Sequence, residues 1–269
     1  MSDPGHHSRG DVDPAGLGLA GSVVLVTGGV RGVGAGISRV FADAGATVVT
    51  CARRPAEEGS PAAGFEFHSA DLRDPEAVAG VVEAILVAHG RLDVLVNNAG
   101  GSPFALAADA SPRFHSKIVE LNLLAPLHVA QAAHGAMRAA GGGAIVNVSS
   151  VSAHRPSPGT AAYGAAKAGV DSLTQSLAVE WAPDVRINSV VVGPVRTEQA
   201  EMHYGDADGI AAVDATIPME RMAEPRDVGL AAAFLASPMA GYVTGSSLTV
   251  HGGGERPAFL DAATANKGE

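Results

Sequence analysis

The sequence predicts an α/β fold in which a parallel sheet of about seven strands carries helices on both faces. Apolar, β-rich runs alternate with helix-like patterns along the chain, and this alternation is typical of a parallel sheet. Several of the runs are continuously apolar, which suits strands buried on both faces. We expect the strands at residues 23–26, 47–50, 65–68, 94–96, 144–148, 187–192 and 247–250.

Helices are expected between these strands, where apolar residues recur at helical spacing. Ile37, Val40 and Phe41 mark the buried face of a first helix at 34–44. Asp74 followed by Pro75 predicts an N-cap and a proline at the first helical position of the next helix. Further helices are expected at 114–140, 163–181 and 225–235.

The length and composition favour one extended domain. The chain has 269 residues, of which 46% are hydrophobic and 17% charged, so a large core is expected. We expect residues 1–18, rich in Gly, Pro, Asp and His, to form a disordered tail, and residues 19–269 to form a single domain. The segment 198–222 lacks a clear period, and a long insertion of this kind is typical of a substrate lid.

Charge and residue usage exclude several classes of function. The formal net charge of −10 argues against nucleic acid or an anionic membrane as a partner, because both need clustered Lys and Arg. The single cysteine, Cys51, cannot form an internal disulfide and is expected to be buried. No apolar run reaches the ~18 residues of a membrane span, and the first residues lack the apolar segment of a signal peptide. We therefore expect a cytoplasmic protein without a metal site.

A glycine-rich turn joins the first expected strand to the first expected helix. Its sequence runs from Thr27 to Gly34 as Thr-Gly-Gly-Val-Arg-Gly-Val-Gly. Such a turn places backbone N–H groups at a helix N-terminus, where they can bind a pyrophosphate. The glycine spacing differs from the common G-x-G-x-x-G pattern, and a turn without a ligand is the alternative.

Arginines stand where a site for NAD usually carries an acidic residue. The second expected strand is followed by Arg53 and Arg54, and the first acidic residue after it is Glu57. An Asp or Glu there would accept from a ribose 2′-hydroxyl, whereas guanidinium groups suit a 2′-phosphate. Together with Arg31 in the glycine turn, this favours NADP(H), with NAD(H) as the alternative and solvated arginines as the simplest explanation.

Tyr163 and Lys167 are spaced so that a phenol and an ammonium share one face of a helix. A nearby ammonium should lower the pKa of the tyrosine, which could then exchange a proton with an alcohol or carbonyl oxygen. Ser150 ends the strand that precedes this helix, and strand ends are where such folds build their sites. Asn122 lies within an apolar helical pattern and needs a polar partner there.

Taken together, these motifs resemble the short-chain dehydrogenase/reductase family, in its common type of about 250 residues. The similarity extends from Leu19 to about Gly254, and the motifs come in the family's order. The resemblance implies a Rossmann-type, doubly wound sheet, and it makes residues 19–269 a dinucleotide-binding catalytic domain. It also implies hydride transfer between a nicotinamide cofactor and a ketone or secondary alcohol.

The resemblance also implies roles for individual residues. Tyr163 would be the general acid/base, Ser150 would hold the substrate oxygen, and Lys167 would lower the pKa of the tyrosine and bind the nicotinamide ribose. Asn122 would hold a water molecule that links Lys167 to solvent. The cofactor would be bound by Gly28, Val30, Arg31, Gly32, Val33, Arg53, Asp71, Leu72, Asn98, Ala99, Gly100, Tyr163, Lys167, Gly193, Val195 and Thr197.

Two positions depart from the family pattern. The family usually has Pro-Gly after the sixth strand, whereas this chain has Gly193 followed by Pro194. The last strand is followed by His251 before the glycines, where the family usually has Asp. The first departure could alter the loop over the nicotinamide, and His251 could simply pack at a subunit contact.

The substrate and partners are less constrained by the sequence. Ser150, His154 and Tyr204 are candidates for substrate contacts, and we expect a small carbonyl or alcohol substrate. An acyl carrier protein is an unlikely partner on charge grounds, because its acidic surface needs a basic patch. Small side chains expected on the outer helix faces, at Ala165, Ala168 and Ala178, and the resemblance itself, point to a homotetramer.

Two other functions stay open at this point. One is an NAD-dependent dehydrogenase of a secondary alcohol, such as a steroid or a cyclic alcohol. The other is a non-catalytic protein that binds a dinucleotide and reports redox state to a partner.

Overall fold

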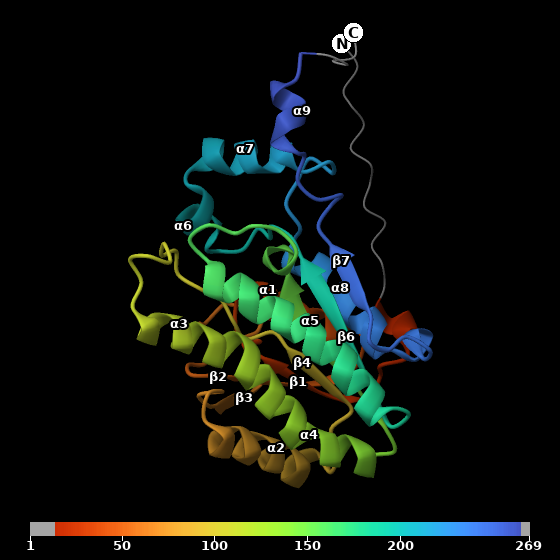
Figure 1. Ribbon diagram of the computed structural model, residues 1–269. Coiled ribbons are helices and arrows are strands. Elements are labelled where there is room, and N and C mark those ends of the chain that lie inside the picture. The colour runs from red at the N-terminus through yellow and green to blue at the C-terminus, as the bar shows by residue number, and fades with distance from the viewer. Residues whose placement is uncertain (1–13, 265–269) are drawn as a thin grey trace.

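The computed structural model describes residues 14–264, and within this range it contains one seven-stranded sheet (Figure 1). All strand pairs are parallel, in the order β3-β2-β1-β4-β5-β6-β7. The predicted fold class is thereby confirmed. The strands are β1 (Val23–Thr27), β2 (Thr47–Ala52), β3 (Glu66–Ser69), β4 (Val94–Asn97), β5 (Gly143–Ser150), β6 (Val185–Val192) and β7 (Ser247–Val250).

Helices cover both faces of the sheet, because each face carries its own apolar core. On one face, α1 (Gly32–Asp43) and α8 (Pro225–Ala236) pack over β1, β4 and β5 through Ile37, Phe41 and Val228. On the other face lie α2 (Pro75–His89), α4 (Ala125–Ala139) and α5 (Ala161–Trp181), which contribute Val81 and Val129 among others. The sheet is therefore buried on both sides, as its continuous apolar runs predict.

The signals for the second helix are confirmed in detail. Asp74 caps α2 by accepting a hydrogen bond from the N–H of Glu76, and Pro75 is its first residue. Gly90 ends the helix in the left-handed conformation, with φ of 72°. Both ends are thus fixed by local chemistry.

The segment predicted as a helix at 114–140 is helical from Pro112 to Ala139, but it contains one π-helical turn that was not predicted. The structure has α3 (Pro112–Val119), a π-helical turn η2 (Glu120–Leu124) and then α4. Pro126 lies in the first turn of α4, and a proline inside a helix removes a donor and clashes with the carbonyl four residues before. That carbonyl belongs to Asn122, so the irregular turn falls on a predicted site residue.

The end of the predicted tail and the predicted lid segment both contain short helical elements. Residues 1–13 of the predicted tail lie outside the described residues, but Pro14–Leu17 form a 3-10 turn, η1, and Leu17 and Leu19 pack against the core. The fold thus begins before Leu19. The predicted lid contains α6 (Ala200–Tyr204) and α7 (Ala207–Thr216), and a short α9 (Ala258–Ala262) follows β7. Figure 1 shows α6, α7 and α9 gathered beyond one end of the sheet.

Candidate active site

The site begins where the connections from the sheet turn in opposite directions, between β1 and β4. Parallel sheets bind ligands at this point, outside the carboxyl ends of the strands. Thr27 ends β1, and its Oγ1 accepts from the N–H groups of Asn98 and Ala99, at 3.0 Å each. The Asn98 amide returns a hydrogen bond to the Thr27 carbonyl at 2.9 Å. These contacts fix the two strand ends together, and Asn98 thus has the supporting contacts expected of it.

The glycine turn packs so closely that side chains would not fit. Gly28 and Gly32 adopt positive φ values of 64° and 51°. A Cβ on Gly34 would lie 2.2 Å from the Gly28 carbonyl oxygen and 2.5 Å from the Asn98 amide nitrogen. No side chain caps the N-terminus of α1, which begins at Gly32. The first N–H groups of the helix therefore fit a pyrophosphate, which hydrogen-bonds readily to such groups.

The basic residues near this turn are exposed. Among the described residues, none forms a hydrogen bond or ion pair with the side chains of Arg31, Arg53 or Arg54. Arg53 directly follows β2, beside the turn, and its charge contributes to lowering the pKa of Asp71.

Cys51 is fully buried at the end of β2, where burial raises the pKa of its thiol to about 12, so it is an inert core residue.

Ser150, Tyr163 and Lys167 come together at the carboxyl end of β5. Ser150 is the last residue of that strand, and α5 carries the other two residues in its first two turns. The Ser150 hydroxyl and the Tyr163 phenol are hydrogen-bonded. The Lys167 ammonium lies 5.7 Å from the centre of the Tyr163 ring and donates to the Val148 carbonyl at 2.7 Å. The three predicted groups thus form one polar cluster.

Burial controls the protonation of this cluster. It raises the pKa of Tyr163, and the hydrogen bond with Ser150 opposes that shift. It lowers the pKa of Lys167 to about 8, against the opposing charge of Asp171. The sequence analysis expected the ammonium to lower the pKa of the tyrosine, whereas the structure gives a net upward shift because desolvation disfavours the phenolate.

Asn122 connects the π-helical turn to the loop after β4. Its side-chain oxygen accepts from the Gly101 N–H at 2.8 Å, and its amide donates to the carbonyls of Gly101 and Ile118. A Cβ on Gly100 would lie 2.6 Å from that oxygen and 3.3 Å from the Lys167 ammonium. Asn122, Gly100 and Lys167 are therefore neighbours.

The loop after β6 approaches the glycine turn from the other side. A Cβ on Gly32 would lie 3.6 Å from the Thr197 methyl group. Val195 forms an isolated β-bridge with Ala223, and the Gly193 N–H donates to the Val250 carbonyl, so this loop is fixed by backbone contacts. Thr197, after β6, thus lies beside Gly32 of the glycine turn, even though the proline has moved.

Comparison with known proteins supports what this geometry indicates. The family model described as "Enoyl-(Acyl carrier protein) reductase" matches residues 28–255. A 3α-hydroxysteroid dehydrogenase of Mediterraneibacter gnavus is 36% identical over 244 residues, covering 87% of this chain and 97% of that protein. The human dehydrogenase/reductase SDR family member 4 is 33% identical over 247 residues, covering 87% of this chain and 88% of that protein.

A solved structure agrees with these sequence relatives. The aldohexose dehydrogenase of Thermoplasma acidophilum has a TM-score of 0.81 with 30% identity, over 93% of this chain and 98% of that one. The chain belongs to the short-chain dehydrogenase/reductase family. Members of this family are NAD(P)-dependent oxidoreductases that act on CH–OH groups, and the chain is an enzyme of this kind.

In this short-chain dehydrogenase/reductase, the segment after β3 contains a contact that the sequence did not reveal. The Arg73 guanidinium donates two hydrogen bonds to the Asp71 carboxylate, from Nε to Oδ1 at 2.9 Å and from Nη2 to Oδ2. These bonds lower the pKa of Asp71 to about 2. Leu72, between them, is buried. The separation of Asp71 and Arg73 by a single residue was the available signal, because a carboxylate and a guanidinium at this spacing can form a bidentate contact.

The two remaining candidates for substrate contacts have partners of their own. The His154 Nε2 lies 3.1 Å from the Asp171 carboxylate, and its side chain is 55% exposed. Burial raises the pKa of Tyr204 on α6, and the charges of Arg155 and Glu255 act on it as well. Arg155 and Glu255 form an ion pair of 2.6 Å between the segment after β5 and the segment after β7. Tyr204 thus lies near this ion pair.

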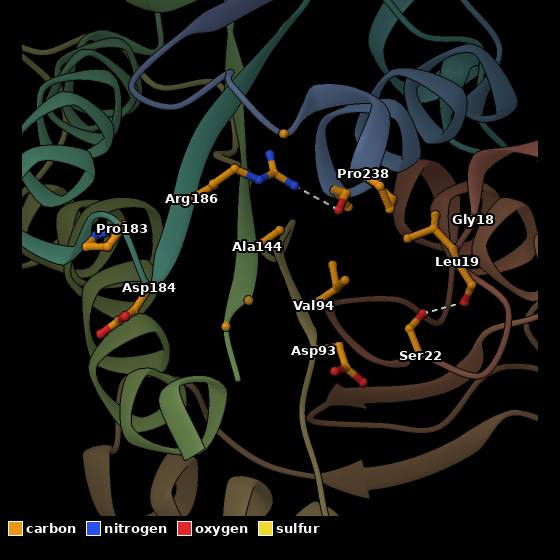
Figure 2. Close-up of a pocket in the computed structure, with 14 residues that line it drawn as sticks. Gly18, Leu19, Ser22, Asp93, Val94, Ala144, Pro183, Asp184, Arg186 and Pro238 are labelled. Atoms are coloured by element: carbon orange, nitrogen blue, oxygen red, sulfur yellow. Dashed lines mark hydrogen bonds between the residues drawn. The ribbon is translucent and has the colours of Figure 1, made fainter. Parts of the chain in front are cut away.

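A hollow of about 410 Å³ lies at the opposite, amino-terminal edge of the sheet (Figure 2). Its polar side chains have partners: Ser22 donates to the Leu19 carbonyl, Asp93 accepts from Arg91, and Asp184 pairs with Arg138. Arg186 donates to four carbonyls around the end of α8. This hollow therefore offers no free polar group for a ligand and is not the active site.

The structure also tests other expectations. Ala165 and Ala168 are exposed on α5, but Ala178 is buried in the core, so that residue was wrongly assigned to an outer face. No helix in the described part of the chain is long and apolar enough to cross a membrane.

Proposed function

We propose that this enzyme reduces a ketone to a secondary alcohol with NADPH, and that Tyr163 is its general acid. The observation that carries the proposal is the cluster of Ser150, Tyr163 and Lys167 beside the glycine turn. When bound, the reduced nicotinamide would supply the hydride. The binding residues are those around the glycine turn described above, with the pyrophosphate at the start of α1.

The residues of the chain supply the proton and hold the substrate. Ser150 donates a hydrogen bond to the carbonyl oxygen, and Tyr163 transfers its phenolic proton to that oxygen as hydride reaches the carbonyl carbon. The C=O π bond breaks while one C–H and one O–H bond form. The raised pKa of Tyr163 supports this direction, because the phenol keeps its proton at neutral pH. Lys167 then stabilises the resulting phenolate, and Asn122 holds a water molecule that returns the proton.

The preference for NADP(H) rests on Arg31 and Arg53. Both guanidinium groups are exposed and without a partner among the described residues, and both flank the glycine turn. A 2′-phosphate would pair with them through charge-assisted hydrogen bonds. No acidic residue stands directly after β2 to bind a 2′-hydroxyl.

The first test is a fluorescence titration with NADPH and NADH in parallel. We expect tighter binding of NADPH, and we expect Arg53→Ala to weaken NADPH at least tenfold while NADH binding stays the same. Arg113→Ala, which removes an exposed charge from α3, is the matched control and should change neither. Equal affinities for both dinucleotides would refute the preference and favour an NAD-dependent dehydrogenase of a secondary alcohol.

The non-catalytic alternative is tested by Tyr163→Phe. General acid catalysis contributes about 10²–10⁴-fold, so reduction of a carbonyl panel should fall by that factor while NADPH affinity is retained. If wild type reduces no carbonyl and Tyr163→Phe preserves every binding property, a dinucleotide-sensing role becomes the better explanation.

For the substrate, we favour an alicyclic ketone. Phe104 is 74% exposed, and its ring rests on Gly159 in the segment between Ser150 and α5. Exposed Met202 on α6 lies in the predicted lid, close in sequence to Tyr204. These apolar groups would cover a ring system, and the relative from M. gnavus is named for a hydroxysteroid. A panel of cyclic and open-chain ketones of equal carbon number would decide this point.

We also propose a cytoplasmic homotetramer that needs neither nucleic acid nor a membrane. Val179 on α5 and Tyr242 before β7 are exposed apolar groups, and β7 is an edge strand with exposed side chains. An acyl carrier protein remains an unfavourable partner, because its acidic surface needs free basic residues. Arg138, in the last turn of α4, already pairs with Asp184. Light scattering at several concentrations checks the tetramer, and a monomer throughout would refute it.

A further inference from the structure

A buried carboxylate lies one helical turn beyond Lys167. Asp171 is on α5, 7% exposed, and Lys167 is 3% exposed. Tyr163, Lys167 and Asp171 follow one another at intervals of four residues, so they share one face of the helix. The reaction proposed above gives Asp171 no part, and the sequence analysis did not single it out.

Two serine hydroxyls hold the carboxylate in place from neighbouring strands. Ser149 on β5 donates to Asp171 Oδ2 at 2.9 Å, and Ser189 on β6 donates to Oδ1 at 2.9 Å. Ser189 also meets the hydroxyl of Ser247 on β7, at 2.8 Å. A buried charge is tolerated when hydrogen bonds satisfy it, and here both oxygens have a donor. The negative charge is thereby fixed behind the active site.

Two titratable groups face this carboxylate. Lys167 lies on the same helix as Asp171. His154 directly follows the short 3-10 turn η3 (Val151–Ala153) after β5, and its Nε2 lies 3.1 Å from Asp171 Oδ2. In the described part of the chain, the strands behind Asp171 contact its carboxylate through the hydroxyls of Ser149 and Ser189. His154 is the group on the solvent side, because its side chain is 55% exposed.

The buried Lys167 ammonium is stabilised by a negative charge nearby. Its ammonium is buried and donates to the Val148 carbonyl, and burial lowers its pKa to about 8, so part of its charge would be lost just above neutral pH. Lys167 forms no direct ion pair within the described part of the chain. Asp171 opposes the shift through its field, since it raises the pKa of Lys167 without touching it.

We propose that Asp171 is a positioning residue that keeps the Lys167 ammonium charged beside Tyr163. The role of the ammonium in proton transfer rests on the proposed function. The electrostatic coupling itself does not. Asp171 is not a catalytic residue, because it does not reach the reacting atoms.

The coupling can be measured without cofactor or substrate. The chain has three lysines, Lys117, Lys167 and Lys267, so lysine labelled with ¹³C at Cε gives a simple NMR spectrum. Lys117→Arg assigns one resonance, Lys267→Arg assigns a second, and the pH titration of the remaining one follows Lys167. We expect its midpoint to fall by about one pH unit in Asp171→Asn, because a nearby opposite charge shifts a pKa by about that much or more.

Asp184→Asn is the matched control. It removes one carboxylate charge from an exposed position, where Asp184 pairs with Arg138, and should leave the Lys167 midpoint unchanged. The Lys117 midpoint should stay constant in both variants. An unchanged Lys167 midpoint in folded Asp171→Asn would overturn the proposal, and so would an equal shift in Asp184→Asn.

Further variants keep the proposal testable if Asp171→Asn does not fold. Asp171→Ser removes the same charge with a smaller group that can hydrogen-bond to both serines, and the same downward shift is expected. Asp171→Glu restores the charge and should restore the midpoint.

The kinetic readout separates this inference from the proposed function. In Asp171→Asn, the alkaline limb of the kcat profile for carbonyl reduction should move to lower pH by the same amount, with the KM for NADPH unchanged. A shifted Lys167 midpoint in an enzyme that reduces no carbonyl would support the coupling and refute the proposed reaction. Reduction with an unshifted midpoint would do the reverse.

Discussion

Replacing Gly34 with alanine tests whether the glycine turn is shaped for a ligand. The new Cβ would lie 2.2 Å from the Gly28 carbonyl oxygen and 2.5 Å from the Asn98 amide nitrogen. Non-bonded heavy atoms pack at about 3.5 Å, so the turn must move by about 1 Å. That movement disturbs the hydrogen bonds of Asn98 to the carbonyls of Thr27 and Gly28, at 2.9 and 3.3 Å.

The expected magnitude follows from opposing contributions. Overpacking costs about 1–3 kcal/mol, whereas alanine is favoured over glycine in a helix by up to about 1 kcal/mol. We therefore expect Gly34→Ala to lower the free energy of unfolding by about 1–2 kcal/mol. Displacing the first N–H groups of α1 should also weaken NADPH at least tenfold, which corresponds to about 1.4 kcal/mol of binding free energy.

The assay combines urea unfolding with a fluorescence titration of NADPH. Gly80→Ala is the matched control, because it lies within α2 and an added Cβ would meet nothing within 4 Å. That variant should be as stable as wild type or up to about 1 kcal/mol more stable, with unchanged affinity. Wild-type affinity in a folded Gly34→Ala protein would refute the assignment of the turn to the pyrophosphate.

Three further predictions follow from side chains outside the turn. Arg186→Met leaves the carbonyls of Leu235 and Ala236 without their side-chain donor, whereas those of Ser237 and Val243 keep a second donor, and we expect a loss of about 2–3 kcal/mol in urea unfolding, with partial recovery in Arg186→Lys; no loss would mean that water replaces the guanidinium fully. Cys51 should resist a disulfide reagent at pH 8 until the protein unfolds, because burial raises its pKa to about 12 and disfavours the thiolate; fast reaction in the folded protein would contradict its placement. Arg155→Ala and Glu255→Gln each break one ion pair at the rim of the site, so both should raise the substrate KM with little change in the Kd for NADPH; unchanged KM would separate that pair from substrate binding.

Local signals predicted most of the fold, because they act within a few residues. Strand runs and the capping of α2 by Asp74 were confirmed on this basis. The helix predicted at 114–140 is present, but its π-helical turn was missed, because apolar periodicity does not reveal the effect of Pro126, whose ring excludes the carbonyl four residues before it. The outer position assigned to Ala178 was wrong because periodicity alone does not give the rotation of a helix within its neighbours.

The candidate site was predicted less evenly. Motif residues such as Ser150 and Tyr163 were brought together as expected, because strand ends and helix starts meet at one edge of a parallel sheet. Asp171 was missed, because its significance depends on Ser149, Ser189 and His154, and no spacing in the sequence shows that three elements converge there. Long-range polar contacts of this kind become visible only when the strands are in register.

The electrostatics of the cluster connect the fold to the direction of the reaction. Burial disfavours charge on both groups, so it raises the pKa of Tyr163 and lowers that of Lys167. A protonated phenol suits reduction, whereas oxidation of an alcohol needs the phenolate and therefore an ammonium that stays charged. The contacts that oppose burial, from Ser150 to the phenol and from Asp171 to the ammonium, both favour that ionised pair. The balance between burial and these two contacts therefore sets the pH dependence of the rate in each direction, and Asp171→Asn should widen the pH range in which the phenol and the amine are both neutral.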